Sequence, residues 1–276
     1  MPASAVPVVV GTAVAAAEGQ VIWWRAAAAL VVAVAIQVGT NYANDYSDGV
    51  RGTDARRVGP VRLVASGLAP AAAVRRAAII SFGVAALAGL ALAAAAGWWL
   101  LLVGAASVAA GWLYTGGPRP YGYLGLGELF VFLFFGLVAT CGTVYVELLR
   151  ITPLAVWFGC AFGFLASAIL VLNNLRDLDT DAAAGKRTLA TRLGRAGTRY
   201  MLLVLVCAAF TVPIVVFLSH MASWTVMLVH FSIPIAAAPV RSAFASTSPP
   251  VLVSALKRMA AAELAFALLL TAGLLL

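Results

Sequence analysis

The stretch QVGTNYANDYSDGVRGTD, Gln37 to Asp54, begins inside an apolar run and ends in a polar loop. Four polar side chains within it are spaced four, three and four residues apart: Gln37, Asn41, Asn44 and Asp48. This spacing predicts one polar stripe along a helix. Asp45 lies beside the stripe, and Asp54 follows it after two glycines.

A second stretch, NNLRDLDTDAAAGKR from Asn173 to Arg187, has the same character. Asn173, Asp177 and Asp181 recur in it every fourth residue. The two stretches together hold six of the ten acidic residues of the chain: Asp45, Asp48, Asp54, Asp177, Asp179 and Asp181. Because carboxylates are costly near a membrane core, their concentration indicates a functional site.

The composition is typical of an integral membrane protein. Of the 276 residues 63% are hydrophobic and 10% are charged, whereas soluble domains are about half apolar and a quarter charged. Repeated long apolar runs favour helices over a β-barrel. The net charge of +8 is carried by loops, which favours membrane anchoring over nucleic-acid binding. We read no signal peptide at the N-terminus.

Nine apolar segments follow one another along the chain, near residues 4–17, 21–44, 72–95, 97–114, 123–146, 152–175, 198–218, 222–245 and 251–275. Most approach the roughly 20 residues that span a bilayer. We therefore predict an all-α membrane protein, a single domain over residues 1–276. Its nine transmembrane helices form one bundle around a central cavity that is open to the cytoplasmic side. Gly159 and Gly163 form a G-x-x-x-G pattern that favours close helix packing.

The distribution of basic residues predicts the orientation of this bundle. With the N-terminus inside, sixteen of the eighteen Lys and Arg residues lie in or beside loops of one face, and only Arg25 and Arg150 lie on the other. The positive-inside rule makes the first face cytoplasmic. Both aspartate stretches then open to the cytoplasm, at the ends of the second and sixth spans.

Carboxylates three or four residues apart on a helix suit Mg²⁺, which completes its coordination shell with water and substrate phosphate. Two such clusters facing each other predict a site that clamps a diphosphate. Basic residues follow each cluster, namely Arg51 and Arg57 after the first and Lys186 and Arg187 after the second. These cations would neutralise the remaining phosphate charge. The residues themselves thus predict Mg²⁺-dependent chemistry on a membrane-bound diphosphate.

The same motifs resemble a known family. The N-D-x-x-D of Asn44–Asp48, the D-x-x-x-D of Asp177–Asp181 and the nine spans are similar to the UbiA superfamily of intramembrane aromatic prenyltransferases. The longer segments NDYSDGVRGTD, VGPVRLVASG and NNLRDLDTDAAAGKRTLATRLG resemble its MenA branch, the 1,4-dihydroxy-2-naphthoate polyprenyltransferases. The chain departs from the general N-D-x-x-D-x-x-x-D motif, since residue 52 is glycine and the next acid is Asp54.

The resemblance implies transfer of a prenyl group from a polyprenyl diphosphate to 1,4-dihydroxy-2-naphthoate, with loss of CO₂, to give demethylmenaquinol in a bacterial cell membrane. It implies Mg²⁺ ligands at Asp48, Asp54, Asp177 and Asp181 and catalytic roles for Asn44 and Tyr114. Substrate contacts are expected from Gln37, Asn41, Asp45, Arg51, Arg57, Asn173, Lys186 and Arg187. Tyr114 could equally be an interfacial aromatic residue, and Gln37 could equally make a helix–helix hydrogen bond.

Three alternatives compete with this interpretation. A CDP-alcohol phosphotransferase shares D-Y-S-D-G, but its motif continues to Ala-Arg where this chain has Gly52 and Thr53. A divalent-cation transporter needs acids along a pathway, whereas these lie at the ends of spans. Prenyltransferases for 4-hydroxybenzoate or homogentisate differ only in the acceptor and remain the nearest alternatives.

Overall fold

The computed structural model describes residues 2–52 and 61–276, and the regular elements in these ranges are all helical. In chain order they are α1 (Pro2–Glu18), α2 (Trp23–Arg51), α3 (Ala71–Ala96), α4 (Leu100–Leu113), the short 3-10 helix η1 (Tyr121–Leu124), α5 (Gly127–Val131), the π-helical turn η2 (Phe132–Val138), α6 (Ala139–Leu148), α7 (Pro153–Ala183), α8 (Leu189–Leu218), the 3-10 helix η3 (Trp224–Ser232), α9 (Ile233–Ala245) and α10 (Pro249–Leu275).

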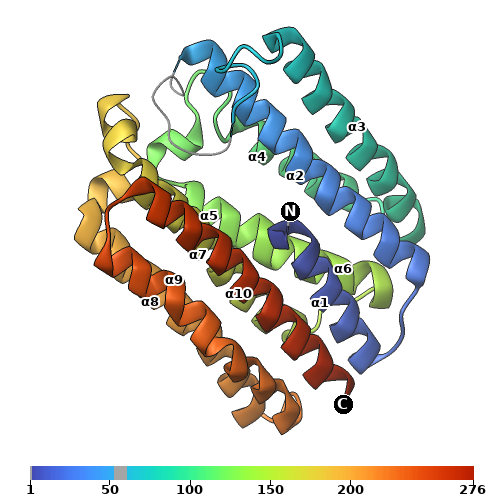
Figure 1. The fold of residues 1–276 in the computed structure, drawn as a ribbon. Coiled ribbons are helices and arrows are strands. Elements are labelled where there is room, and N and C mark those ends of the chain that lie inside the picture. Colours follow the sequence, from blue (N-terminus) through green and yellow to red (C-terminus); the bar gives the residue numbers. More distant parts are fainter. Residues whose placement is uncertain (1, 53–60) are drawn as a thin grey trace.

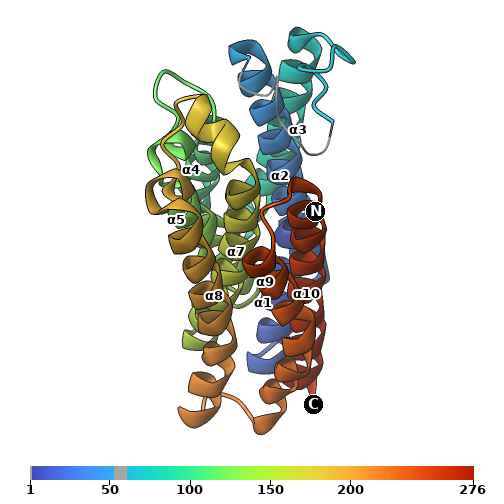
Figure 2. The same cartoon turned by 60° about the vertical axis from the view of Figure 1, so that its left-hand side comes forward.

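The helices form one elongated bundle (Figure 1). Helix α2 packs along α3, and α7 packs along α8 and η2. Helix α10 contacts α1, α7, α9 and η3, so the C-terminal helix closes the bundle against the N-terminal one. The view in Figure 2 shows the α2–α3 pair and α7 reaching the same end of the bundle. The C-terminal ends of α2 and α7, which carry the two aspartate stretches, are thereby placed near each other.

Helix α7 lies at the centre of the apolar core. Thr152 caps its N-terminus by accepting a hydrogen bond from Ala155 N at 3.2 Å, and Pro153 occupies the first turn, where no amide donor is needed. The side chains of Phe158 and Phe162 are fully buried, as are most residues of the helix up to Asp177. A rigid central helix therefore carries the second aspartate stretch.

Close packing of α7 against η2 depends on three glycines, as the G-x-x-x-G pattern predicted. A Cβ atom at Gly136 would lie 2.4 Å from the Gly163 Cα atom, and one at Gly159 would lie 3.2 Å from the Cα atom of Leu137. No side chain fits at the closest of these approaches. The two backbones come together at the level where α7 is most buried.

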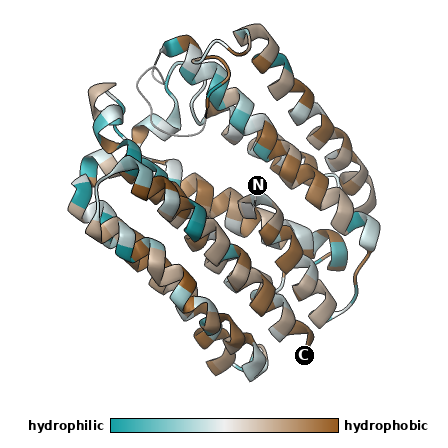
Figure 3. Cartoon of the chain, in the orientation of Figure 1, coloured by the Kyte–Doolittle hydropathy of each residue, from teal (hydrophilic) through white to brown (hydrophobic). Residues whose placement is uncertain are grey.

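Within the described residues, seven helical segments are long and apolar enough to cross a membrane: α2, α3, the continuous α5–η2–α6 segment, α7, α8, the η3–α9 segment and α10. The first and fourth predicted segments correspond to the shorter apolar helices Ala3–Glu18 and Leu100–Leu113. Each of the nine predicted segments thus falls on a helix, and the chain is an integral membrane protein. Figure 3 shows hydrophobic residues along most of the bundle and hydrophilic residues near the C-terminal ends of α2 and α7.

Candidate active site

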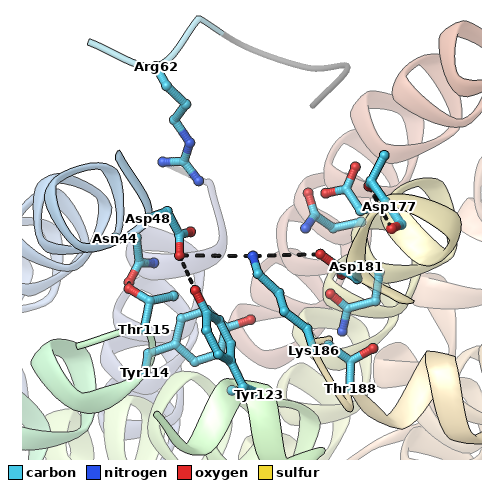
Figure 4. A pocket seen from close by; sticks show the side chains of 14 residues that line it. Asn44, Asp48, Arg62, Tyr114, Thr115, Tyr123, Asp177, Asp181, Lys186 and Thr188 are labelled. Carbon is cyan, nitrogen blue, oxygen red and sulfur yellow. Dashed lines mark hydrogen bonds and ion pairs between the residues drawn. The ribbon is translucent and has the colours of Figure 1, made fainter. Parts of the chain in front are cut away.

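A polar pocket of about 70 Å³ lies between the C-terminal ends of α2 and α7. The segment after α4 and the turn after α7 close its other sides (Figure 4). Among its lining residues are seven that the sequence predicted: Asn44, Asp48, Tyr114, Asn173, Asp177, Asp181 and Lys186. Helices α2 and α7 continue to Arg51 and Ala183, so the polar residues at the C-terminal end of each stripe lie on one side of their helix and line this pocket. The two stretches therefore form one site, although more than a hundred residues separate them.

Lys186 bridges the two aspartate stretches. Its Nζ atom lies 3.9 Å from Oδ1 of Asp48 on α2 and 3.6 Å from Oδ1 of Asp181 on α7 (Figure 4). The turn that follows α7 holds it in place, since the Lys186 backbone N–H donates to the Asp181 carbonyl at 2.9 Å. All three side chains are largely buried. The ammonium therefore compensates two carboxylates that would otherwise repel each other at short range.

Asp177 is held by its neighbour Arg176. The Arg176 Nε atom donates to Asp177 Oδ1 at 2.7 Å, and Nη2 donates to Oδ2 at 2.5 Å. Nη2 also donates to Oδ1 of Asn173 at 2.9 Å. The Arg176 side chain is only 2% exposed, so the fork is rigid and fixes the orientation of both polar side chains on α7. Arg176 was not among the predicted site residues, although it directly precedes Asp177.

Tyr123 of η1 contacts Asp48 of the first aspartate stretch and also lies near the cations of Lys186 and Arg51. Its hydroxyl donates to Asp48 Oδ1, and its ring lies 4.7 Å from Lys186 Nζ and 5.7 Å from the Arg51 guanidinium carbon. Cations over an aromatic face are stabilised by the ring quadrupole. Tyr123 was missed by sequence reasoning because it belongs to a third segment with no acidic motif.

Other lining residues were also missed. Arg62 reaches into the pocket from the segment that follows residue 60 (Figure 4). Asn174 donates through Nδ2 to the buried Glu128 Oε1 at 2.9 Å, which fixes its amide beside Asn173. The signal for Arg62 was its place in VGPVRLVASG, the segment that follows the first aspartates.

An apolar chamber of about 410 Å³ adjoins the polar pocket. Asn44, Tyr114 and Asn173 line both spaces, so the two meet at these three side chains. Gln37 and Asn41 line the chamber rather than the pocket, and the Gln37 amide donates to Asn41 Oδ1 at 3.1 Å. The rest of the lining is mainly aliphatic and aromatic. A molecule with a charged head and an apolar tail would fit this pair of spaces.

Aromatic rings form one wall of the chamber next to the junction. Tyr121 stacks on Phe130 with ring centroids 4.0 Å apart and meets the edge of Tyr114 at 5.5 Å. Its hydroxyl donates to the Ala110 carbonyl at 2.8 Å. Burial raises the pKa of the Tyr121 phenol above its ordinary value, so the ring stays neutral. Electron-rich faces thus surround the point where head and tail of a ligand would meet.

Three predicted substrate-binding residues line neither the pocket nor the chamber. Asp45 accepts hydrogen bonds from the backbone N–H groups of Leu63 and Val64 at 2.8 and 3.0 Å, which ties the segment bearing Arg62 to α2. Arg51 donates to the carbonyl oxygens of Thr115 and Gly117. The Arg187 side chain is exposed, and its backbone N–H donates to the Tyr123 carbonyl at 3.0 Å. In this structure the contacts of these three residues support the surrounding segments, and their direct contact with substrate stays a prediction.

Two further predicted residues, Asp54 and Arg57, lie outside the described residues. Within the described part of the chain, no group of three or more His, Cys, Asp and Glu side chains is close enough to hold a metal ion. Asp48, Asp177 and Asp181 instead surround one small pocket, with the Lys186 ammonium between two of them. This oxygen-only donor set fits Mg²⁺, which needs few protein ligands and takes the others from water and phosphate.

Comparison with known proteins agrees with this geometry. Residues 4–261 match the UbiA prenyltransferase family. A Mycobacterium tuberculosis protein named 1,4-dihydroxy-2-naphthoate octaprenyltransferase is 50% identical over 244 residues, 88% of this chain and 83% of the relative. A Bacillus subtilis protein of the same name is 32% identical over 277 residues, 100% of this chain and 89% of the relative.

Two solved structures have the same fold. The apo structure of a UbiA homolog from Aeropyrum pernix K1 superimposes with a TM-score of 0.75 at 15% identity, covering 99% of this chain and 96% of that one. A UbiA homolog from Archaeoglobus fulgidus bound to GPP and Mg²⁺ gives a TM-score of 0.60 at 16% identity, covering 98% and 97%. At these identities the likeness concerns the arrangement of the helices.

Proposed function

The chain belongs to the UbiA prenyltransferase family, and we propose that it transfers the prenyl group of a polyprenyl diphosphate to 1,4-dihydroxy-2-naphthoate in menaquinone biosynthesis. The observation that carries this proposal is the junction of a charged pocket with an apolar chamber. The names of the relatives that are 50% and 32% identical support the acceptor.

The donor fits the two spaces in one orientation. Its diphosphate occupies the polar pocket, where Lys186 and Arg62 supply positive charge. Its isoprenoid chain occupies the apolar chamber, because burying hydrocarbon there removes it from polar surroundings. The first carbon of the chain then lies at the junction, beside Asn44, Tyr114 and Asn173.

Asp48, Asp177 and Asp181 would hold Mg²⁺ together with the diphosphate, with Asp54 as a further proposed ligand. When bound, Mg²⁺ neutralises the charge that develops on the departing diphosphate. Arg176 keeps the Asp177 carboxylate oriented toward the pocket, and the Tyr123 hydroxyl does the same for Asp48. These contacts preorganise the carboxylates before substrate arrives.

The chemistry proceeds at the junction. The bond between the first carbon of the donor and its oxygen breaks, and the electron pair leaves with the diphosphate, giving an allylic cation. The rings of Tyr114 and Tyr121 stabilise that cation and exclude water from it. The naphthoate carbon that bears the carboxylate forms the new C–C bond. The C–CO₂ bond then breaks and returns its electron pair to the ring, so demethylmenaquinol, diphosphate and CO₂ are the products.

The membrane arrangement follows from the same proposal. We infer that residues 1–276 form a single domain with nine spans, including the two shorter helices, in a bacterial cell membrane. The site would open to the cytoplasm, because sixteen of eighteen basic residues lie at that face. This orientation gives water-soluble naphthoate direct access, whereas the donor enters from the lipid.

A purified-enzyme assay tests the proposal. The protein in detergent is incubated with Mg²⁺, geranylgeranyl diphosphate and one of two acceptors, 1,4-dihydroxy-2-naphthoate or 4-hydroxybenzoate, and prenylated product and CO₂ are quantified. The proposal predicts product only with the naphthoate, accompanied by an equal amount of CO₂, and loss of both when EDTA is added. Product only with the benzoate would show that the proposed acceptor is wrong. No product with either acceptor would contradict the proposed function and favour the alternative of a divalent-cation transporter.

A further inference from the structure

Besides the closely packed Gly111, three glycines on three different helices line the apolar chamber: Gly89 of α3, Gly104 of α4 and Gly142 of α6. A Cβ atom at Gly104 or Gly142 would meet nothing within 4 Å, and one at Gly89 would meet only the Val32 Cγ2 atom at 4.0 Å. The chamber extends to these positions because side chains are absent there. None of the three has a positive φ angle, so the backbone does not require glycine.

Glycine inside a helix is also costly. It destabilises a helix by roughly 0.5–1 kcal/mol relative to alanine, because it loses more backbone freedom on folding. Close packing explains Gly136 and Gly163, whose Cβ atoms would collide with neighbouring backbone. It does not explain Gly104 or Gly142. Their common property is that they border the chamber.

The three glycines lie at the end of the chamber remote from the polar pocket. Gly104 precedes Tyr114 by ten residues, which is about 15 Å along α4. Gly89 lies at the level of Val32, and Val32 precedes Asn44 by twelve residues, about 18 Å along α2. Gly142 follows the chamber-lining Phe135 by about two turns. A short tail fixed at the diphosphate would not reach them, whereas a long tail would pass between them.

We propose that Gly89, Gly104 and Gly142 determine the length of isoprenoid chain that the enzyme accepts. This inference rests on the proposed function, since it takes the donor's tail as the occupant of the chamber. The chamber and the pocket proposed for the diphosphate share three lining residues, which supports the donor's tail as the occupant of the chamber. A bulky side chain at one of the glycines would occupy the space of the later isoprene units and leave the first units undisturbed.

The test compares two donors in the full-length protein. Gly104→Phe and Gly142→Leu are assayed with geranyl diphosphate and with octaprenyl diphosphate, using 1,4-dihydroxy-2-naphthoate as acceptor. The expected result is a fall of at least about tenfold in kcat/KM for the octaprenyl donor, with geranyl transfer within about twofold of wild type. Gly104→Ala, which adds one methyl group to open space, should leave the ratio of the two donors near the wild-type value.

Gly83→Phe is the matched control. Gly83 is also an open glycine of α3, but it is exposed and does not line the chamber, so both donors should react as in wild type. Equal losses with both donors, or an unchanged ratio in both chamber variants, would overturn the inference. If one of the two chamber variants elutes as aggregate in gel filtration, the same comparison of donors is made with the other variant and with Gly89→Leu. If wild type transfers neither chain, the proposed function fails and the inference with it.

Discussion

Replacing Lys186 with methionine should make the protein depend on Mg²⁺ for stability. The substitution keeps an unbranched side chain of similar length and removes the charge that bridges Asp48 and Asp181 at 3.9 and 3.6 Å. A charge pair at such a separation contributes about 1 kcal/mol in water and about 4 kcal/mol near a protein surface. Since the three side chains are largely buried, we expect an unfolding free energy lower by about 2–4 kcal/mol in EDTA.

The same substitution should strengthen Mg²⁺ binding. In wild type the ammonium competes with a divalent cation for the two carboxylates, whereas Lys186→Met removes this competing charge. Mg²⁺ should therefore raise the Tm of the variant more than that of wild type, because ligand binding stabilises the folded state in proportion to its affinity. Prenyl transfer should still fall by about 100-fold, since the diphosphate loses a cation.

The assay is a thermal melt in detergent, in EDTA and across a Mg²⁺ titration. Lys257→Met is the matched control, because Lys257 is the other lysine of the chain and is exposed on α10. Its melting should match wild type in both conditions. An equal Mg²⁺-induced shift in Lys186→Met and wild type would refute the view that Lys186 and the metal share the same carboxylates.

Three further predictions concern the carboxylates and the packing that supports them. Asp177→Asn should abolish turnover and lower the free energy of unfolding by about 3–5 kcal/mol, because it leaves the buried Arg176 charge without its carboxylate partner. Asp181→Asn should also abolish turnover, but with a much smaller change in Tm. Tyr123→Phe removes the hydroxyl that orients the α2 carboxylate but keeps the ring, so kcat/KM should fall about tenfold while the circular dichroism melt is unchanged. Gly136→Ala should destabilise by about 1–3 kcal/mol in the same melt, since its methyl group would lie 2.4 Å from the α7 backbone; a neutral effect would contradict the close packing.

Much of the fold could be predicted because membrane helices are encoded locally. The apolar segments, the helical continuation of both polar stripes and the G-x-x-x-G contact follow from composition and spacing, which neighbouring elements do not change. Because Asp48 and Asp177 carry matching motifs, their meeting in one pocket was also predictable. The spacing of side chains within each helix was sufficient for that prediction.

The remaining site residues depend on how separate segments pack. Tyr123 and Arg62 enter the site through contacts that no single segment encodes, whereas Arg176 contacts Asp177 and Asn173 of its own helix. Conversely, Asp45 was predicted to contact substrate, but it follows Asn44 of the polar stripe by one residue, and one residue along a helix turns a side chain by about 100°. It therefore faces the backbone of Leu63 and Val64 instead of the pocket. A central cavity was predicted, but most residues that line the chamber could not be predicted for the same reason, since its walls come from many helices.

The central claim is that Asp48 on α2 and Asp181 on α7 would hold one and the same diphosphate through Mg²⁺. A double-mutant cycle on the Mg²⁺-dependent affinity for an unreactive prenyl diphosphate analogue tests it directly, with Asp48→Asn, Asp181→Asn and the double variant. Asp179→Asn serves as the control partner, because Asp179 is exposed and pairs with Arg195 away from the pocket. A shared clamp predicts a coupling of at least about 1 kcal/mol for Asp48 with Asp181 and none for Asp48 with Asp179. If the losses of binding free energy are additive within about 0.5 kcal/mol for both pairs, the shared clamp is contradicted.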